Sequence, residues 1–280
     1  ECRAVATLYL RVDKETPERL LGAPDGLPPI PREQDCTRVP RLRPLGVTWD
    51  CCTAGYLPDR PMAALTDVTL WRFGKLFNDR VDLIAWPLRL RRLKFGVMFD
   101  QSVTGIGWPK SLQQIEFGDS FNQDVESVEW PTSLQQVVFG ERFNQPIEGI
   151  ALPPCLRRLV FRGNFNKPIR RVSWPPSLKK VEFGASFNHP IIGVTWPMAL
   201  EELSFGCFFH QDVEGAAWPT SLRKLTFRTE FSKGICEVRW PSTIKQLSFG
   251  VRCDQTMEGL AWSDSLQDLK LGGEFNGWTE

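Results

Sequence analysis

Large hydrophobic residues return at fixed positions every 22 residues from about residue 64 to the C-terminus. Each repeat follows the pattern Trp-Pro-x-Ser-Leu-x-x-Leu-x-Phe-Gly-x-x-Phe-Asn-x-x-Ile-x-x-Val-x, whose positions we number 1 to 22 from the Trp. The Trp-Pro pairs begin at Trp86, Trp108, Trp130, Trp174, Trp196, Trp218 and Trp240, Leu152-Pro153 fills the gap, and Trp262-Ser263 closes the series. Residues 64–85 fit the pattern without Trp-Pro. A fixed period of this kind predicts a solenoid of about ten stacked coils, the last one incomplete.

Two short stretches of each repeat alternate between apolar and polar residues. In one repeat they are Leu112-x-x-Ile115-x-Phe117 and Val125-x-x-Val128-x-Trp130. Alternation with period two between Gly and Pro is typical of β-strands, and the intervening Pro and Gly exclude helices. The sequence therefore predicts an all-β protein: a flattened, leucine-rich-repeat-like parallel β-solenoid in which each coil adds one strand to each of two parallel sheets.

Phenylalanine fills positions 10 and 14, which together hold 18 of the 19 Phe residues. Apolar columns that repeat from coil to coil predict a stacked core, so we expect Phe121 and Phe143 to be buried and in contact. Cys253 replaces Phe in the second column and is expected to be a buried thiol.

Position 15 is a polar column. It contains Asn78, Asn122, Asn144, Asn166, Asn188 and Asn276, with Asp100, His210, Ser232 and Asp254 in the other coils. Such side chains are expected to bond turn amides and one another along the stack. A calcium site would need converging carboxylates, and the two Asp residues lie in distant coils.

The Trp column has two interpretations. The indoles could form an exposed stacking ladder for a sugar or a nucleic acid. Alternatively they pack into the core or its corner, which is the favoured interpretation because the Val-x-Trp alternation places each indole on the side of the buried Val.

The two ends differ from the repeats. Residues 1–62 do not repeat: Val5 to Val12 is predicted to be a strand, and the Pro-rich stretch after it an extended arm. We expect this segment to cap the first coil and residues 63–280 to form the solenoid. The chain stops in the middle of a coil at Glu280. Either a partner covers this edge, or the chain is part of something longer.

Three consecutive repeats resemble a known family. The segments Phe143-Asn144-Gln145-Pro146-Ile147, Phe165-Asn166-Lys167-Pro168-Ile169 and Phe187-Asn188-His189-Pro190-Ile191 are similar to the signature of FNIP repeats, a leucine-rich-repeat-like class of about 22 residues known mainly from protists. The resemblance covers roughly residues 64–280 and implies an interaction architecture, with no chemistry to carry over. Trp-Pro in place of the more usual Leu-Pro is a departure on which the family gives no guidance.

Outward positions are sorted by charge. The pairs at positions 6 and 7 are mostly basic, and they supply a candidate partner-binding face: Arg91, Arg92, Arg157, Arg158, Lys179, Lys180, Arg223 and Lys224. On the other predicted sheet the outward residues lean to acid, with Glu126, Glu148, Glu214, Glu237 and Glu258, interrupted by Arg170-Arg171. The alternative is a solvated surface on which Glu201 and Glu202 pair with neighbouring Lys and Arg residues across strands.

Composition excludes several classes of function. A formal net charge of +1 gives no field that would attract nucleic acid, and no apolar run is long enough to span a membrane. Cys155, Cys207, Cys236 and Cys253 occupy different repeat positions, so no disulfide is expected among them, while pairing within the first 52 residues stays open. His189 and His210 are the only two histidines, and no metal or catalytic constellation is expected around them.

These observations favour a non-enzymatic scaffold that binds other proteins, acidic ones at the basic face or one that covers the C-terminal coil, with no cofactor. It could be a structural subunit of a larger assembly. Two alternatives remain: a carbohydrate-binding or carbohydrate-modifying β-solenoid, and a purely structural spacer. The cellular compartment is not indicated.

Overall fold

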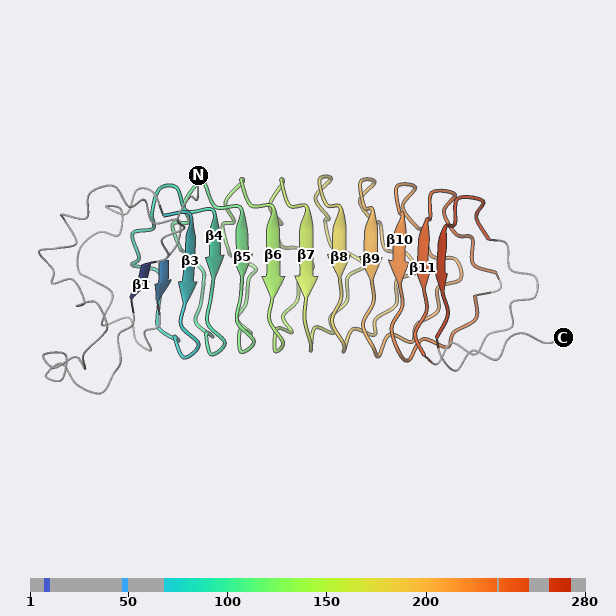
Figure 1. Cartoon of the computed structure of the whole chain (residues 1–280), viewed down its shortest axis with the longest axis horizontal. Helices are drawn as coiled ribbons and strands as arrows, with labels where there is room; N and C mark the ends of the chain where they lie inside the picture. Colours follow the sequence, from blue (N-terminus) through green and yellow to red (C-terminus); the bar gives the residue numbers. More distant parts are fainter. Residues whose placement is uncertain (1–7, 11–46, 50–67, 236, 252–261, 273–280) are drawn as a thin grey trace, which may run out of the picture.

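The computed structural model describes residues 8–10, 47–49, 68–235, 237–251 and 262–272. The strands among them form one parallel sheet of 12 strands in sequence order (Figure 1). The strands are β1 Leu8–Leu10, β2 Val47–Trp49, β3 Leu70–Phe73, β4 Arg92–Lys94, β5 Gln114–Glu116, β6 Gln136–Phe139, β7 Arg158–Phe161, β8 Lys180–Glu182, β9 Glu202–Ser204, β10 Lys224–Thr226, β11 Gln246–Ser248 and β12 Asp268–Lys270. No helix occurs among the described residues.

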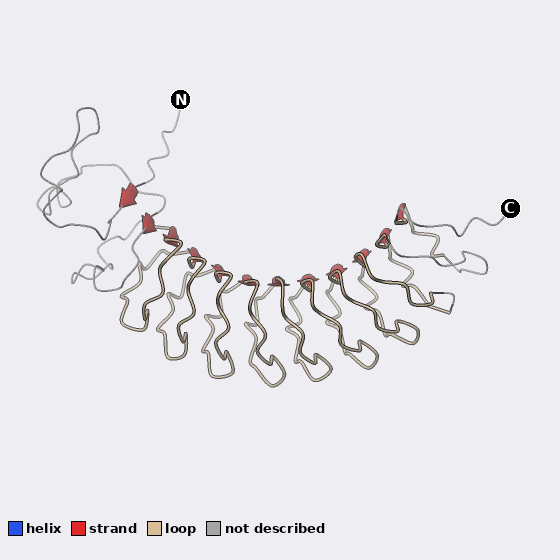
Figure 2. Cartoon of the chain, turned by 90° about the horizontal axis from the view of Figure 1, so that it is seen from below, coloured by secondary structure: helices blue, strands red, loops and turns tan. Residues whose placement is uncertain are grey.

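The coils follow one another at the interval that the sequence sets. From β3 to β12 each strand pairs with the equivalent residues of the next, as in Leu93 with Ile115 and Ile115 with Val137, one 22-residue repeat apart. The stack makes about nine turns. Figure 2 shows that it bends into an arc, with the strands along the inner, concave side and the turns around the outside. The predicted all-β, leucine-rich-repeat-like parallel solenoid is therefore confirmed.

The predicted second sheet is wrong. Residues 125–130, where the second strand was expected, form a turn and irregular chain, and the same holds in the other described coils. The amide of Val128 bonds the carbonyl of Val125 at 3.3 Å, and the amide of Trp130 bonds the carbonyl of Val128 at 3.1 Å. Both N–H groups are bonded within their own coil, and the Pro that follows the Trp has no N–H group. This stretch therefore cannot form a ladder of backbone hydrogen bonds to the next coil.

The core consists of the predicted ring columns. Phe121 and Phe143 are fully buried, and their ring centroids lie 6.0 Å apart with planes 6° from parallel, which confirms the expected contact. Within one coil, Phe139 and Phe143 stack at 3.9 Å. Each ring therefore has partners both in its own coil and in the adjacent ones.

The spacing of the columns explains the arc. Strands in a sheet lie about 4.8 Å apart. Rings at position 10, next to the sheet, are 5.4 Å apart at Phe95 and Phe117, whereas indoles at position 1 are 6.2 Å apart at Trp86 and Trp108. Adjacent coils are thus closest at the sheet and spread toward the outer side, which curves the stack and widens the gap that a second ladder would have to bridge.

Side chains connect the coils away from the sheet. The amide of Asn144 donates to Oδ1 of Asn122 at 2.8 Å, and the amide of Asn166 donates to Oδ1 of Asn144 at 2.9 Å. The same bond recurs from Asn78 to His210, which confirms the predicted polar ladder over the described coils. At position 4, the Ser111 hydroxyl donates to carbonyls of the preceding coil.

The sheet continues beyond the repeats at its N-terminal end. β1 lies inside the predicted strand from Val5 to Val12 and pairs in parallel with β2, which pairs with β3. No strand was predicted at β2, in the stretch after the Pro-rich segment. The remaining expectations for residues 1–62, the mid-coil stop at Glu280, and the expectations for Cys236, Cys253, Asp254, Glu258 and Asn276 fall outside the described residues.

Candidate functional site

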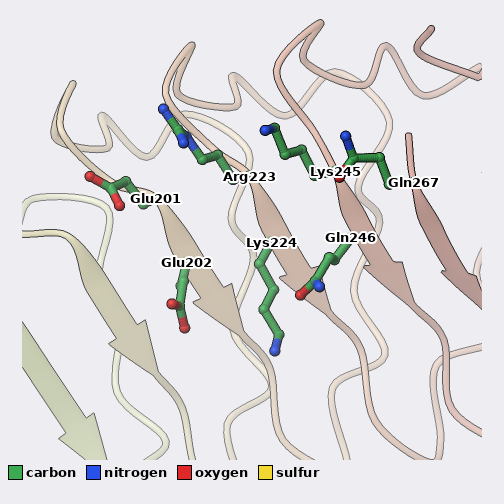
Figure 3. Close-up of a pocket in the computed structure, with 7 residues that line it drawn as sticks. All are labelled: Glu201, Glu202, Arg223, Lys224, Lys245, Gln246 and Gln267. Atoms are coloured by element: carbon green, nitrogen blue, oxygen red, sulfur yellow. The ribbon is translucent and has the colours of Figure 1, made fainter. Parts of the chain in front are cut away.

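All eight candidate basic residues lie on one surface, the concave side of the sheet. They occupy positions 6 and 7, where the chain enters each strand, while the residue at position 8 points into the core: Arg92 and Lys94 are exposed and Leu93 between them is buried. We call the surface formed by positions 6, 7 and 9 the concave face. Figure 3 shows part of it, with the labelled side chains standing on the strands in parallel rows.

Several of these cations are paired with carboxylates on the next strand. Lys179 Nζ lies 2.7 Å from a carboxylate oxygen of Glu201, and Lys180 Nζ lies 2.8 Å from Glu202 and also 3.3 Å from Glu182 of its own strand. Arg158 donates to Glu182 at 2.7 Å. The expected cross-strand pairing of Glu201 and Glu202 is therefore confirmed for Lys179 and Lys180, but it is wrong for Arg223 and Lys224, which form no ion pair with a described residue.

These pairs shift the titration of their members. Burial disfavours the charged form of Glu182, but the hydrogen bond from Arg158 and the charges of Lys180 and Arg158 outweigh it and lower its pKa. Burial likewise opposes the charge of Lys180, and Glu202 and Glu182 still raise its pKa. The Lys179 hydrogen bond lowers the pKa of Glu201. The charge of Arg223 on the next coil also lowers the pKa of Glu201, so the network borders the cations that follow it along the sheet.

A second network lies over the middle of the sheet. Glu116 accepts from Lys94 on one side and from Arg162 on the other, both at 2.9 Å, although Arg162 is two coils away. Burial opposes the charge of Glu116, and the hydrogen bonds from Lys94 and Arg162 nevertheless lower its pKa. Arg162 reaches it across Val138, which is 3% exposed. A depression of about 400 Å³ lies here, with Val138 and Val160 in its lining.

The remaining cations of the concave face are exposed and form no ion pair with any described residue. They are Arg72, Arg91, Arg92, Arg157, Arg223, Lys224 and Lys245. Arg223, Lys224 and Lys245 line a depression of about 230 Å³ together with Gln246 and Gln267, bordered by Glu201 and Glu202 (Figure 3). Both depressions are open grooves on the sheet.

The acidic half of the predicted charge sorting does not lie on a sheet. Glu126, Glu148, Glu214 and Glu237 are in turns outside the sheet, as is the Arg170-Arg171 pair. The expectation of two oppositely charged sheet faces is wrong because the second sheet does not exist. Charge sorting survives as a difference between the concave face and the outer turns.

The Trp column packs into the core and its corner, which is the interpretation that the sequence favoured. Trp86, Trp108, Trp196 and Trp240 are buried, and Trp130, Trp174 and Trp218 are partly buried against the same core. The indole N–H groups of these seven residues have no hydrogen-bond acceptor in the described structure. The indoles stack on one another, as Trp174 and Trp196 do at 5.7 Å, so their flat faces are occupied by neighbouring rings.

Candidate residues for metal or redox chemistry are scattered. His189 Nε2 lies 3.2 Å from the carbonyl of Asn166, and His210 Nδ1 lies 3.1 Å from that of Glu230. The described residues contain no group of three His, Cys, Asp or Glu side chains placed to hold a metal ion. Cys155 and Cys207 are free thiols. No helix in the described part of the chain could cross a membrane.

Sequence reasoning missed the residues of position 9 and position 11. Glu116 and Glu182 stand at position 9, which belongs to the concave face because it alternates with the buried position 8. Arg162 stands at position 11, where most coils have Gly, and that departure was the available signal. Lys245 was visible as half of the Lys245-Gln246 pair but was not counted with the basic pairs.

This geometry is that of a leucine-rich-repeat-like solenoid, in which a parallel sheet forms the concave side of a stack of short coils. The FNIP Repeat family model matches residues 121–162 and 143–186, so this part of the chain carries FNIP repeats. No curated protein sequence matches the chain.

Solved structures resemble the fold. The circular LRR protein CroV588 superposes with a TM-score of 0.51 and 28% sequence identity over 75% of this chain and 40% of its own. The chain thus spans less than half the length of that protein. An internalin, InlF from Listeria monocytogenes, matches with a TM-score of 0.48 and 15% identity over 81% of this chain and 72% of its own. The sheet topology and the similarity to CroV588 make the protein a leucine-rich-repeat-like repeat protein, a fold that commonly mediates protein interactions.

Proposed function

We propose that this protein is a non-enzymatic scaffold that binds other proteins, including as a structural subunit of a larger assembly, and that it does so through its concave face. The observation that carries the proposal is the row of exposed cations on a curved sheet, held in register by every coil. A rigid surface of this kind presents charges at fixed spacing, which favours orientation and association rate in docking. An acidic protein surface is the matching partner.

The shape of the surface supports protein binding more than carbohydrate binding or catalysis. The concave face runs along the whole stack of described coils, and its two depressions have volumes of only about 230 and 400 Å³. The indoles that would stack on sugar rings are buried or partly buried in the solenoid. The exposed carboxylates of the concave face are in ion pairs with lysine and arginine, which does not favour acid-base chemistry by them.

The test is capture from an extract of the native source with immobilised wild-type protein and with a variant in which Arg91, Arg92, Arg223 and Lys224 are all Gln. The variant should fold, since these four side chains are exposed and form no ion pair with a described residue. It should retain specific partners less well, and the loss should shrink as salt rises. If the variant captures every partner as well as the wild type does across a salt series, the concave face is only a solvated surface and does not bind partners. A glycan array with a turnover assay, run in parallel, distinguishes the carbohydrate alternative.

A further inference from the structure

The unpaired cations of the concave face gather near its two ends. One group, which we call the N-terminal cation group, is Arg72, Arg91 and Arg92, at β3 and β4. The C-terminal cation group is Arg223, Lys224 and Lys245, at β10 and β11. All six side chains are exposed, and none makes an ion pair with a described residue.

On the surface between the two groups most of the cations are paired. Lys94, Arg158, Arg162, Lys179 and Lys180 are all bound to carboxylates of the same surface. The other side chains at positions 6, 7 and 9 of this section are glutamines, Ser204, the buried Val138 and Val160, and Arg157, the one cation there without an ion pair among the described residues.

The distance between the groups follows from the register. Arg92 pairs with Gln114, and the same column continues through β6, β7, β8 and β9 to Lys224, six strands further on. At about 4.8 Å per strand, the two groups are roughly 29 Å apart along the sheet. Because both are carried by one continuous ladder, this separation is fixed.

We propose that the concave face binds one extended acidic protein segment whose two acidic clusters sit on the N-terminal and C-terminal cation groups, with a neutral stretch between them. This inference rests on the proposed function and specifies the chemistry of its partner. In an extended chain at about 3.3 Å per residue, the centres of the two acidic clusters are about nine residues apart.

The middle of the concave face favours a protein over a nucleic acid. A nucleic-acid strand carries a phosphate at every nucleotide, so a strand that spans both groups would place phosphates over Glu182, Glu201 and Glu202. Carboxylates already bound to lysine and arginine offer such phosphates no net attraction. A protein segment can place acidic residues at its ends and neutral residues in the middle.

Synthetic peptides test the spacing. Each carries two short blocks of Glu joined by a neutral Ser, Ala and Val spacer, with block centres about 5, about 9 or about 13 residues apart. Fluorescence anisotropy with the full chain should give the tightest binding at about nine residues, about tenfold tighter than at five, because a shorter linker cannot reach both groups at once. A polyuridine oligonucleotide of similar charge serves as the nucleic-acid probe.

Matched variants test the two groups. Arg91→Gln with Arg92→Gln, and Arg223→Gln with Lys224→Gln, should each weaken the nine-residue peptide about tenfold and remove the dependence on spacing. Arg170→Gln with Arg171→Gln removes the same charge from a turn outside the sheet and should change affinity less than about twofold. Arg158→Gln with Glu182→Gln removes an ion pair from the section between the groups and should also leave affinity nearly unchanged. Circular dichroism confirms that each variant is folded.

Affinity independent of block spacing would overturn the inference, as would an equal loss in the turn variant or tighter binding of the oligonucleotide than of the nine-residue peptide. The proposed function fails on a different result, namely that capture of native partners does not depend on the concave face at all. Native capture that depends on the face, combined with peptide binding that ignores spacing, would therefore retain the scaffold and reject the two-group arrangement.

Discussion

The inner and outer sides of each coil have almost the same sequence pattern and different structures. Leu112-x-x-Ile115-x-Phe117 lies on the sheet side, whereas Val125-x-x-Val128-x-Trp130 forms a turn and irregular chain on the outer side. On the sheet side, backbone amides form hydrogen bonds from each coil to the next. On the outer side the backbone amides bond within their own coil, and adjacent coils are connected by stacked aromatic rings and Asn side chains. Alternation of apolar residues thus identifies a buried face, and the availability of amides decides whether that face is a strand.

Gly118 offers the most severe way to disturb the sheet side. A Cβ at this residue would stand 1.7 Å from the carbonyl oxygen of Gly96 in the preceding coil, so Gly118→Ala must push two coils apart. We expect a loss of more than about 4 kcal/mol in the free energy of unfolding, measured by denaturant titration. Gly107→Ala is the control, because nothing lies within 4 Å of its added Cβ; equal losses in the two variants would contradict the close approach.

Phe121 tests the core that joins the two sides. Phe121→Ala removes a fully buried ring that stacks on Phe143 and should cost about 3–5 kcal/mol through lost transfer energy and the cavity left behind. Phe208→Ala removes the same side chain where it is 56% exposed and should cost much less. Thermal and denaturant unfolding of both variants would show the difference, and similar stabilities would refute the stacked column.

Asn144 probes the outer side. Asn144→Ala removes the acceptor of the Asn166 amide and should cost about 1 kcal/mol, since water replaces part of the bond at this half-exposed position. Asn164→Ala is matched, because the side chain of Asn164 is exposed and makes no hydrogen bond to a described residue. No difference between the two variants in unfolding free energy would mean that the Asn ladder is not stabilising.

Glu116 gives the smallest effect and a pH dependence. Its pKa is lowered by Lys94 and Arg162, so its contribution to stability is present above the ordinary carboxyl pKa of about 4.3 and is lost as the pH falls through its own lower value. Glu116→Gln should therefore be destabilised by about 0–1 kcal/mol at neutral pH, and this difference from the wild type should shrink as the pH falls below the ordinary carboxyl pKa. A difference that persists in acid would show that the effect is not ionic.

The sequence was sufficient for the period, for a strand within positions 5 to 10 and for the two Phe columns, because each is repeated many times. It was not sufficient for the absent second sheet, which depends on the local bonds of Val128 and Trp130. The sequence could not predict the hydrogen bond from Arg162 to Glu116. The bond is made by a single long side chain to a residue two coils away, and it does not recur in the other repeats. The division of the cations into paired and unpaired groups depends on such contacts in the same way.

Reactivity of lysines on the two sides is the most direct test of the claim that the concave face is the docking surface. Lys224 and Lys245 lie on that face, whereas Lys110 and Lys167 lie outside the sheet. Acetylation is measured by mass spectrometry at each lysine, with and without the acidic peptide whose blocks are about nine residues apart. The account predicts that Lys224 and Lys245 become protected while Lys110 and Lys167 react as before. Protection confined to the outer lysines, or equal on both sides, would contradict it.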